Sequence, residues 1–136
     1  MKIRVTILFA IFFFLSKMSS AQIDAPTDSI KNMLCHKWGF KAILMGGQRL
    51  TNMNETVTYE FFADNTFKRV PSKGKPENGT WTYQADLKNV LLKLKKTTLH
   101  IATLTRDELI VSIGDGKDEA KNSMGMGTVL KIVSSN

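Results

Sequence analysis

Cysteine and histidine supply the side chains that most readily act as nucleophiles or proton carriers near neutral pH, and the chain has three: Cys35, His36 and His100. Cys35 and His36 are adjacent, which invites a thiolate–imidazole interpretation. Consecutive residues of an extended segment point to opposite faces, so these two side chains cannot easily share a proton. His100 falls on the outer side of an alternating segment, where we expect a solvated surface histidine. The sequence therefore predicts no catalytic residue and a protein that is not an enzyme.

Metal and cofactor sites leave ligand patterns that this sequence lacks. Zinc needs about four ligands at recognisable spacing, and one cysteine with two histidines does not provide them. Residues 115–119 are acidic but lack the alternating oxygen ligands and the glycine position of a calcium-binding loop. No glycine motif for a phosphate group is present. We expect neither a metal nor a cofactor.

Aromatic side chains are the remaining feature that could bind something. Alternation places seven of them on one face of successive strands, so they would project into a common interior. They either fill that interior or line a cavity, and the sequence leaves both open. A buried tyrosine hydroxyl needs a hydrogen-bond partner, which a ligand or a water molecule could supply. With two loop methionines, the candidate ligand-binding residues are Phe40, Tyr59, Phe61, Phe67, Trp81, Tyr83, Met124 and Met126.

The stretch from residue 56 to residue 83 must position most of these side chains. Val57, Tyr59 and Phe61 alternate with polar residues, which is typical of a strand with one buried face. Asp64-Asn65 suits a tight turn, so Phe67 should begin an antiparallel partner strand. Residues 79–83 then supply a third strand, with Trp81 and Tyr83 facing inward. The segment predicts a three-stranded meander with an aromatic inner face.

The rest of the chain extends this pattern. Ile30, Met33 and Leu34 share one face of a short helix starting near Ser29, capped by Thr27 or Asp28. The expected strands cover residues 37–44, 56–62, 67–70, 79–83, 89–94, 97–104, 109–113 and 128–133. We predict an all-β fold: an eight-stranded antiparallel up-and-down barrel with a short N-terminal helix. The last strand should pair with the first, which leaves no open edge.

The first residues predict export. Residues 1–21 combine a basic start, an apolar run and the small residues Ser19-Ser20-Ala21, which are typical of a secretory signal peptide cleaved after Ala21. Residues 22–33 would then be a linker with the short helix, and residues 34–136 the barrel domain. The leader holds three of the 19 basic residues, so the net charge falls from +7 to +4. We expect a secreted or periplasmic protein that is not stably inserted in a membrane.

The remaining charge does not predict a nucleic-acid partner. Nucleic-acid binding favours a basic stripe interleaved with exposed aromatic side chains. Here the lysines are dispersed, apart from Lys93, Lys95 and Lys96, and they lie on the opposite side of the alternation from the aromatics. The distribution is that of a soluble surface with lysines at exposed strand positions.

Four short motifs together resemble small secreted bacterial lipocalin-like domains. They are residues 34–38, 59–67, 79–81 and 101–109, so the resemblance spans nearly the whole chain after the leader. His36 and Asn65 stand where that family has glycine; asparagine also adopts positive φ. The resemblance implies a small calyx-like barrel of the lipocalin or calycin type and binding of a small apolar molecule.

The lengths of the connections suggest which end of such a barrel is open. Residues 46–55, 71–78 and 114–127 are long connections that fall at one end, and carry Met45, Met53, Met124 and Met126. The tight turns, apart from the one at Lys95-Lys96, and the helix fall at the other end. The leading hypothesis is non-catalytic binding of a small, mostly apolar molecule that enters between the loops. The alternative is a module with a solid core whose loops bind a protein or polysaccharide at the cell envelope.

Overall fold

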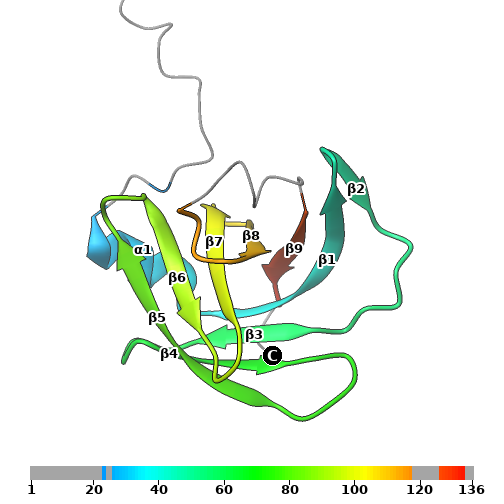
Figure 1. Ribbon diagram of the computed structural model, residues 1–136, viewed down its shortest axis with the longest axis horizontal. Helices are drawn as coiled ribbons and strands as arrows, with labels where there is room; N and C mark the ends of the chain where they lie inside the picture. The colour runs from blue at the N-terminus through cyan, green and yellow to red at the C-terminus, as the bar shows by residue number, and fades with distance from the viewer. Residues whose placement is uncertain (1–22, 24–25, 118–125, 134–136) are drawn as a thin grey trace, which may run out of the picture.

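The structure is a computed structural model that describes residues 23, 26–117 and 126–133. The predicted leader lies outside the described residues. The described chain has one short helix and nine strands (Figure 1). They are α1 (Thr27–Leu34), β1 (Lys37–Met45), β2 (Gln48–Leu50), β3 (Thr58–Phe61), β4 (Thr66–Val70), β5 (Glu77–Gln84), β6 (Asn89–Lys93), β7 (Thr98–Leu104), β8 (Glu108–Ile113) and β9 (Gly127–Ile132).

The strands form one antiparallel sheet that closes on itself. The order is β2-β1-β3-β4-β5-β6-β7-β8-β9, and β9 also pairs with β1. Trp38 lies opposite Tyr59 of β3 on one side and Ile132 of β9 on the other. The short β2 only extends β1, and the other eight strands form the closed barrel. This confirms the predicted eight-stranded up-and-down barrel with a short helix. A bulge at Lys41 shifts the β1–β9 register, which lets β1 bend around the barrel.

Local turn chemistry explains how the predicted hairpins form. Asn65 has φ +68°, and the Asp64 carboxylate accepts a hydrogen bond from the Thr66 backbone N–H. Gly46 and Gly47 have φ +56° and +82°, a conformation that favours glycine, and they end β1 as expected.

Most element boundaries differ from the prediction by one or two residues, and β2, β5 and α1 differ in ways that matter to the fold. β2 occupies part of the expected loop at residues 46–55, where it extends β1 as a hairpin. β5 begins at Glu77, so the connection after β4 is shorter than predicted. The helix begins at Thr27 after Pro26, without a side-chain cap. The exposed, polar character of β2 and of the start of β5 hides both from a search for buried alternation.

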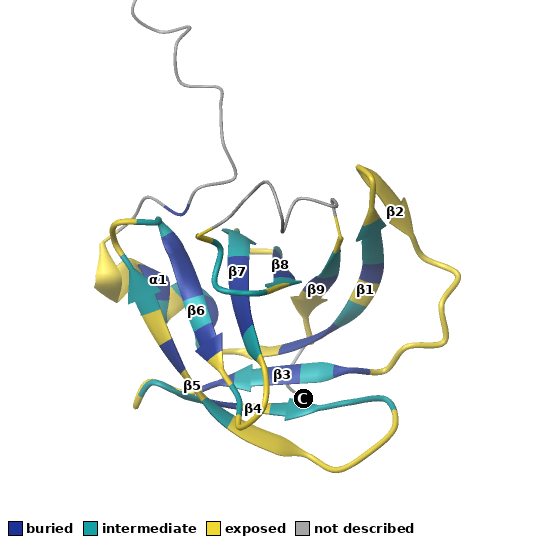
Figure 2. Ribbon diagram, in the orientation of Figure 1, coloured by how far each residue is buried: buried dark blue, intermediate teal, exposed yellow. Residues whose placement is uncertain are grey.

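The core occupies the barrel interior nearest α1. Val57, Tyr59 and Phe61 are buried, as the alternation predicts. Figure 2 shows buried and intermediate positions alternating along β3. Ile30 and Leu34 of α1 are fully buried against the same cluster. The Trp38 indole N–H donates to the Leu34 carbonyl oxygen at 2.9 Å, so the helix closes this end of the barrel.

His100 is not the solvated residue that the sequence suggests. It lies on the outer face of β7 but is only 6% exposed, because the segment after β8 runs over it. Its Nδ1 is 3.0 Å from the Gly114 carbonyl oxygen. Asn89, on the neighbouring strand, donates to the Asp115 carbonyl oxygen. Sequence alternation could not reveal a cover that comes from a distant connection.

A second outer contact fixes the β1–β2 hairpin. Glu108 of β8 accepts from Arg49 Nη2 at 2.6 Å and from Lys41 Nζ at 3.0 Å. β1 and β9 separate β2 from β8 in the sheet. Ala42 and Val129 are almost completely buried although their register places them on the outer face, which fits a hairpin folded toward that face.

Candidate functional site

The end of the barrel away from α1 is hollow. An open cavity of about 550 Å³ lies between β1, β3–β5, the connection from β6 to β7, and β7–β9. Its walls include the apolar side chains Ile43, Leu94, Leu99 and Val111, and Ile113 stands at the rim with 76% of its surface exposed. The complete lining is Ile43, Tyr59, Arg69, Glu77, Leu94, Thr97, Leu99, Val111, Ser112, Ile113, Met126, Gly127 and Thr128.

A second cavity of about 560 Å³ adjoins the first, and its lining is more polar. The two cavities share Ile43, Tyr59, Arg69 and Thr128. Its other lining residues are Phe40, Asn54, Glu55, Val57, Pro71, Ser72 and Lys73, from β1 and the connections around β3 and β4. An apolar and a polar compartment therefore meet at Arg69 and Tyr59.

Tyr59, Arg69 and Glu77 form a polar ladder where the cavities meet. They face each other across three strands, because Tyr59 pairs with Arg69 and Arg69 pairs with Glu77. Arg69 Nε donates to the Tyr59 hydroxyl oxygen at 3.0 Å, and Arg69 Nη1 donates to Glu77 Oε2 at 2.9 Å. Burial raises the pKa of Tyr59, although the nearby Arg69 charge opposes this shift. The phenol is therefore neutral at physiological pH.

The predicted site residues divide between the cavities and the packed core. Tyr59 lines both cavities, Phe40 the second and Met126 the first. Phe61 and Phe67 are buried and stack with ring centroids 5.5 Å apart. These two rings and the buried Trp81 lie outside the lining of either cavity and fill the closed half.

The last two predicted site residues are Tyr83, which lies outside the lining of either cavity, and Met124. The Tyr83 hydroxyl donates to the Ile23 carbonyl oxygen at 2.7 Å, so a backbone group near the helix supplies the partner that the sequence left open. Met124 lies outside the described residues. Some of the predicted aromatic side chains therefore fill the closed half of the barrel, and others line the cavities in the open half.

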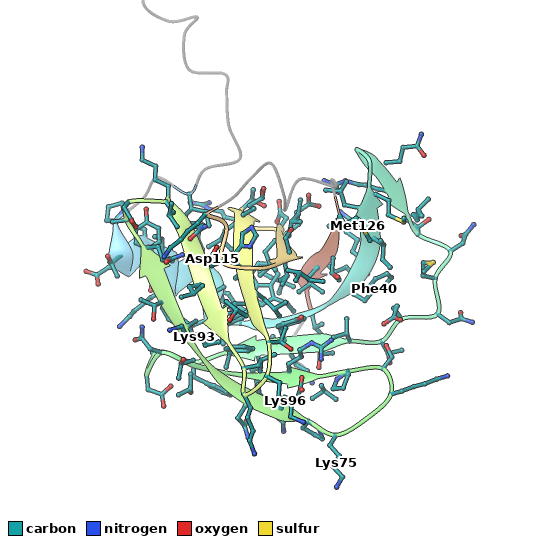
Figure 3. All side chains as sticks on the ribbon, viewed as in Figure 1. Phe40, Lys75, Lys93, Lys96, Asp115 and Met126 are labelled. Carbon is teal, nitrogen blue, oxygen red and sulfur yellow. The ribbon has the colours of Figure 1, made fainter. Side chains whose placement is uncertain are left out.

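The mouth is built partly as expected. Met45 and Met53 are exposed in the β1–β2 hairpin and the connection that follows it. Figure 3 shows Phe40 and Met126 on the β1 side, whereas Asp115 lies beside β6. The start of the connection after β8 therefore turns back over the outer face instead of ringing the mouth.

The residues considered for catalysis are not brought together. His36 Nε2 is 3.0 Å from the Asn32 carbonyl oxygen, and burial raises the pKa of the Cys35 thiol. That thiol is therefore less nucleophilic at neutral pH than a free cysteine. Among the described residues, no three acidic, cysteine or histidine side chains gather as metal ligands would.

Arg69 and Glu77 are not among the predicted site residues, although the alternation contains a signal for Arg69. Arg69 follows Phe67 by two residues and therefore shares its inward face. The Tyr59 hydroxyl also required a partner. Glu77 falls in the stretch 71–78, which the sequence predicts to be a loop, so its register opposite Arg69 does not follow from the pattern.

The fold and the cavities define a small calyx-like β-barrel. No protein-family model and no curated protein matches the chain. Among solved structures, it is similar to the NMR structure of a protein from Bacteroides uniformis ATCC 8492. The two chains are 23% identical, with 76% of this chain and 91% of the other covered and a TM-score of 0.47.

Proposed function

We propose that the protein binds a small, mostly apolar molecule in the open half of the barrel without converting it chemically. The cavity beside Leu99 and Val111 carries this proposal. Its volume of about 550 Å³ falls within the range of roughly 300–1,000 Å³ typical of ligand pockets. Apolar walls with a few placed polar groups are also typical of such pockets. The resemblance to lipocalin-like domains agrees with this function.

A titration with the neutral fluorophore N-phenyl-1-naphthylamine tests the proposal. Thr128 borders both cavities, so Thr128→Phe should narrow the space where they meet and weaken probe binding. Thr80→Phe is the matched control, because Thr80 is exposed on the opposite face of its strand from the buried Trp81. It should bind the probe as the wild type does.

The possible results separate the two candidate functions. If a folded Thr128→Phe variant still binds the probe with wild-type affinity, binding takes place elsewhere and the cavity is not the site. If the folded wild type binds neither this probe nor other apolar probes, the binding function fails. The module that uses its loops to contact a protein or polysaccharide then becomes the better interpretation.

We also propose that the barrel works outside the cytoplasm, after cleavage behind Ala21. The composition of residues 1–21 supports this. Within the described chain, no helix is long and apolar enough to cross a membrane. N-terminal sequencing of the protein from its own host should find Gln22 first. Finding Met1 in a membrane fraction would replace secretion with anchoring.

A further inference from the structure

Arg69 is a cation placed in the wall of a largely apolar cup. Its side chain is 29% exposed and lines both cavities. An arginine offers five N–H donors, and its Nε and Nη1 are used by Tyr59 and Glu77. Arg69 Nη2 has no hydrogen-bond partner within the described part of the chain. No buried side-chain nitrogen or oxygen of the described residues lacks a partner, so the free Arg69 donor faces the open cavity, where a ligand or water can accept a hydrogen bond from it.

Tyr59 adds a second available donor at the same place. Its hydroxyl oxygen accepts from Arg69 Nε, and the hydroxyl proton has no acceptor among the described residues. The ring is only 3% exposed, so this proton faces the cup or a neighbouring group and not bulk water. A guanidinium N–H and a phenol O–H together match the oxygens of an anionic group.

From this arrangement we infer that the ligand is an amphiphile with an acidic head group, such as a carboxylate on an apolar chain. The head group binds Arg69 and Tyr59 where the two cavities meet, and the apolar chain occupies the cavity lined by Leu94, Leu99 and Val111. This inference rests on the proposed function and names the ligand class for the same site.

The charges that line the two cavities balance, with Arg69 and Lys73 against Glu55 and Glu77. The preference for an anion therefore comes from the free donors of Arg69 and Tyr59. Both nearby carboxylates already accept hydrogen bonds, Glu77 from Arg69 and Glu55 from the Ser72 hydroxyl. Glu77 is also the more exposed partner, at 48% against 29% for Arg69. When the head group of a ligand replaces Glu77 as the acceptor for Arg69, water can solvate the Glu77 carboxylate. Arg69 remains in the cavity wall and binds the head group. Lys73 adds a second positive charge to the polar cavity.

The test uses 11-(dansylamino)undecanoic acid, which carries a carboxylate at one end and a fluorophore at the other, and its methyl ester. Removing the charge from the ester should weaken binding about tenfold or more, since a hydrogen bond to a charged group contributes on the order of a factor of ten. Arg69→Met should remove this preference, so that acid and ester bind alike.

Lys68→Met is the matched control. It removes the same charge from the adjacent position of β4, where the side chain is exposed and faces outward. This variant should keep the preference for the acid. Circular dichroism and thermal unfolding of both variants establish that they are folded, and Arg69→Lys, which keeps the charge, should restore part of the preference.

Four outcomes bear on the inference differently. Preference for the acid in wild type and Lys68→Met but not in Arg69→Met supports it. Equal binding of acid and ester by the wild type overturns the acidic head group and leaves the proposed function intact. Binding of neither probe overturns both. Displacement of the probe by acetate at concentrations where undecanoate also displaces it would mean a simple anion site, and would overturn the amphiphile.

Discussion

Arg69 Nε and the Tyr59 hydroxyl oxygen lie 3.0 Å apart inside the barrel, on strands that pair directly. The guanidinium carbon is 5.8 Å from the centroid of the same ring. The bond holds the one inward arginine of β4 against an otherwise aromatic wall. Tyr59 therefore serves two purposes, since its ring packs in the core while its hydroxyl orients a charge.

Replacing Tyr59 with phenylalanine should separate these purposes. Tyr59→Phe keeps the ring and its stacking on Phe61, whose centroid is 6.1 Å away, but removes the hydroxyl. We expect a loss of about 1 kcal/mol in the free energy of unfolding, the usual contribution of one hydrogen bond. Urea denaturation measures it. A loss above about 3 kcal/mol would show that the hydroxyl has a further structural partner.

Trp81 should contribute far more to stability than a neighbouring exposed aromatic residue. It is 1% exposed, and its indole N–H donates to the Phe62 carbonyl oxygen at 2.9 Å. Trp81→Ala should cost about 3–5 kcal/mol, the typical cost of deleting a buried large aromatic side chain. Phe62→Ala, at a residue that is 41% exposed, should cost about 0.5 kcal/mol or less. Similar losses in thermal stability for the two variants would contradict the core assignment.

Two glycines should respond to alanine for different reasons. A Cβ at Gly79 would overlap the Lys93 carbonyl oxygen and the Phe67 ring, because β5 passes closely over both. Gly79→Ala should therefore destabilise the fold by about 1–3 kcal/mol, as overpacking does. Gly47→Ala meets no atom within 4 Å but has φ +82°, so it should cost about 1 kcal/mol from backbone strain alone. Urea midpoints of both variants compare the two effects, and a larger loss in Gly47→Ala would contradict the close approach at Gly79.

The stability contributed by Glu108 should depend on pH. Hydrogen bonds from Arg49 and Lys41 lower the pKa of Glu108 from 4.5 to about 2. A lowered folded-state pKa stabilises the fold above pH 4.5, and this contribution disappears as the pH falls from 4.5 to about 2. Glu108→Gln should therefore be less stable than wild type at pH 7, and the difference should shrink over that interval. Urea unfolding at several pH values measures it; a constant difference down to pH 2 would show that the ion pairs do not contribute.

Chain length should control affinity if the apolar cavity holds the tail of the ligand. In a series of unbranched carboxylic acids, each added methylene should tighten binding by up to about 0.8 kcal/mol until the cavity is full. Displacement of a bound dansyl probe gives the affinities. Affinities that do not change with chain length would place the chain in water and not between Leu99 and Val111.

The inner face of the barrel was predictable because its residues obey a strict period. Val57, Tyr59 and Phe61 repeat every second position, and burial selects apolar side chains there. β2 is not predicted from the sequence because Gln48, Arg49 and Leu50 are all exposed, so its residues show no alternation of apolar and polar side chains.

The polar part of the site was harder to foresee for a different reason. The alternation of β4 places Arg69 on the inner face, whereas its charge is typical of an outer, solvated position. Only its register opposite Tyr59 and Glu77 shows that it faces inward. The burial of His100 depends on a segment that follows a different strand. Both features arise from pairing between elements, which a scan along the sequence does not contain.

The β1–β9 pairing has a consequence for how the chain matures. Every other ladder joins strands that are consecutive along the sequence or, for β1 and β3, separated only by the short β2, whereas Trp38 meets Ile132 only when the last strand has been synthesised. Until then β1 keeps an open edge that can pair with other chains. Closure over so long a loop is slow, so a nascent chain that stays unfolded until its final strand is free would avoid misassembly. The proposed export through a membrane channel would impose this condition.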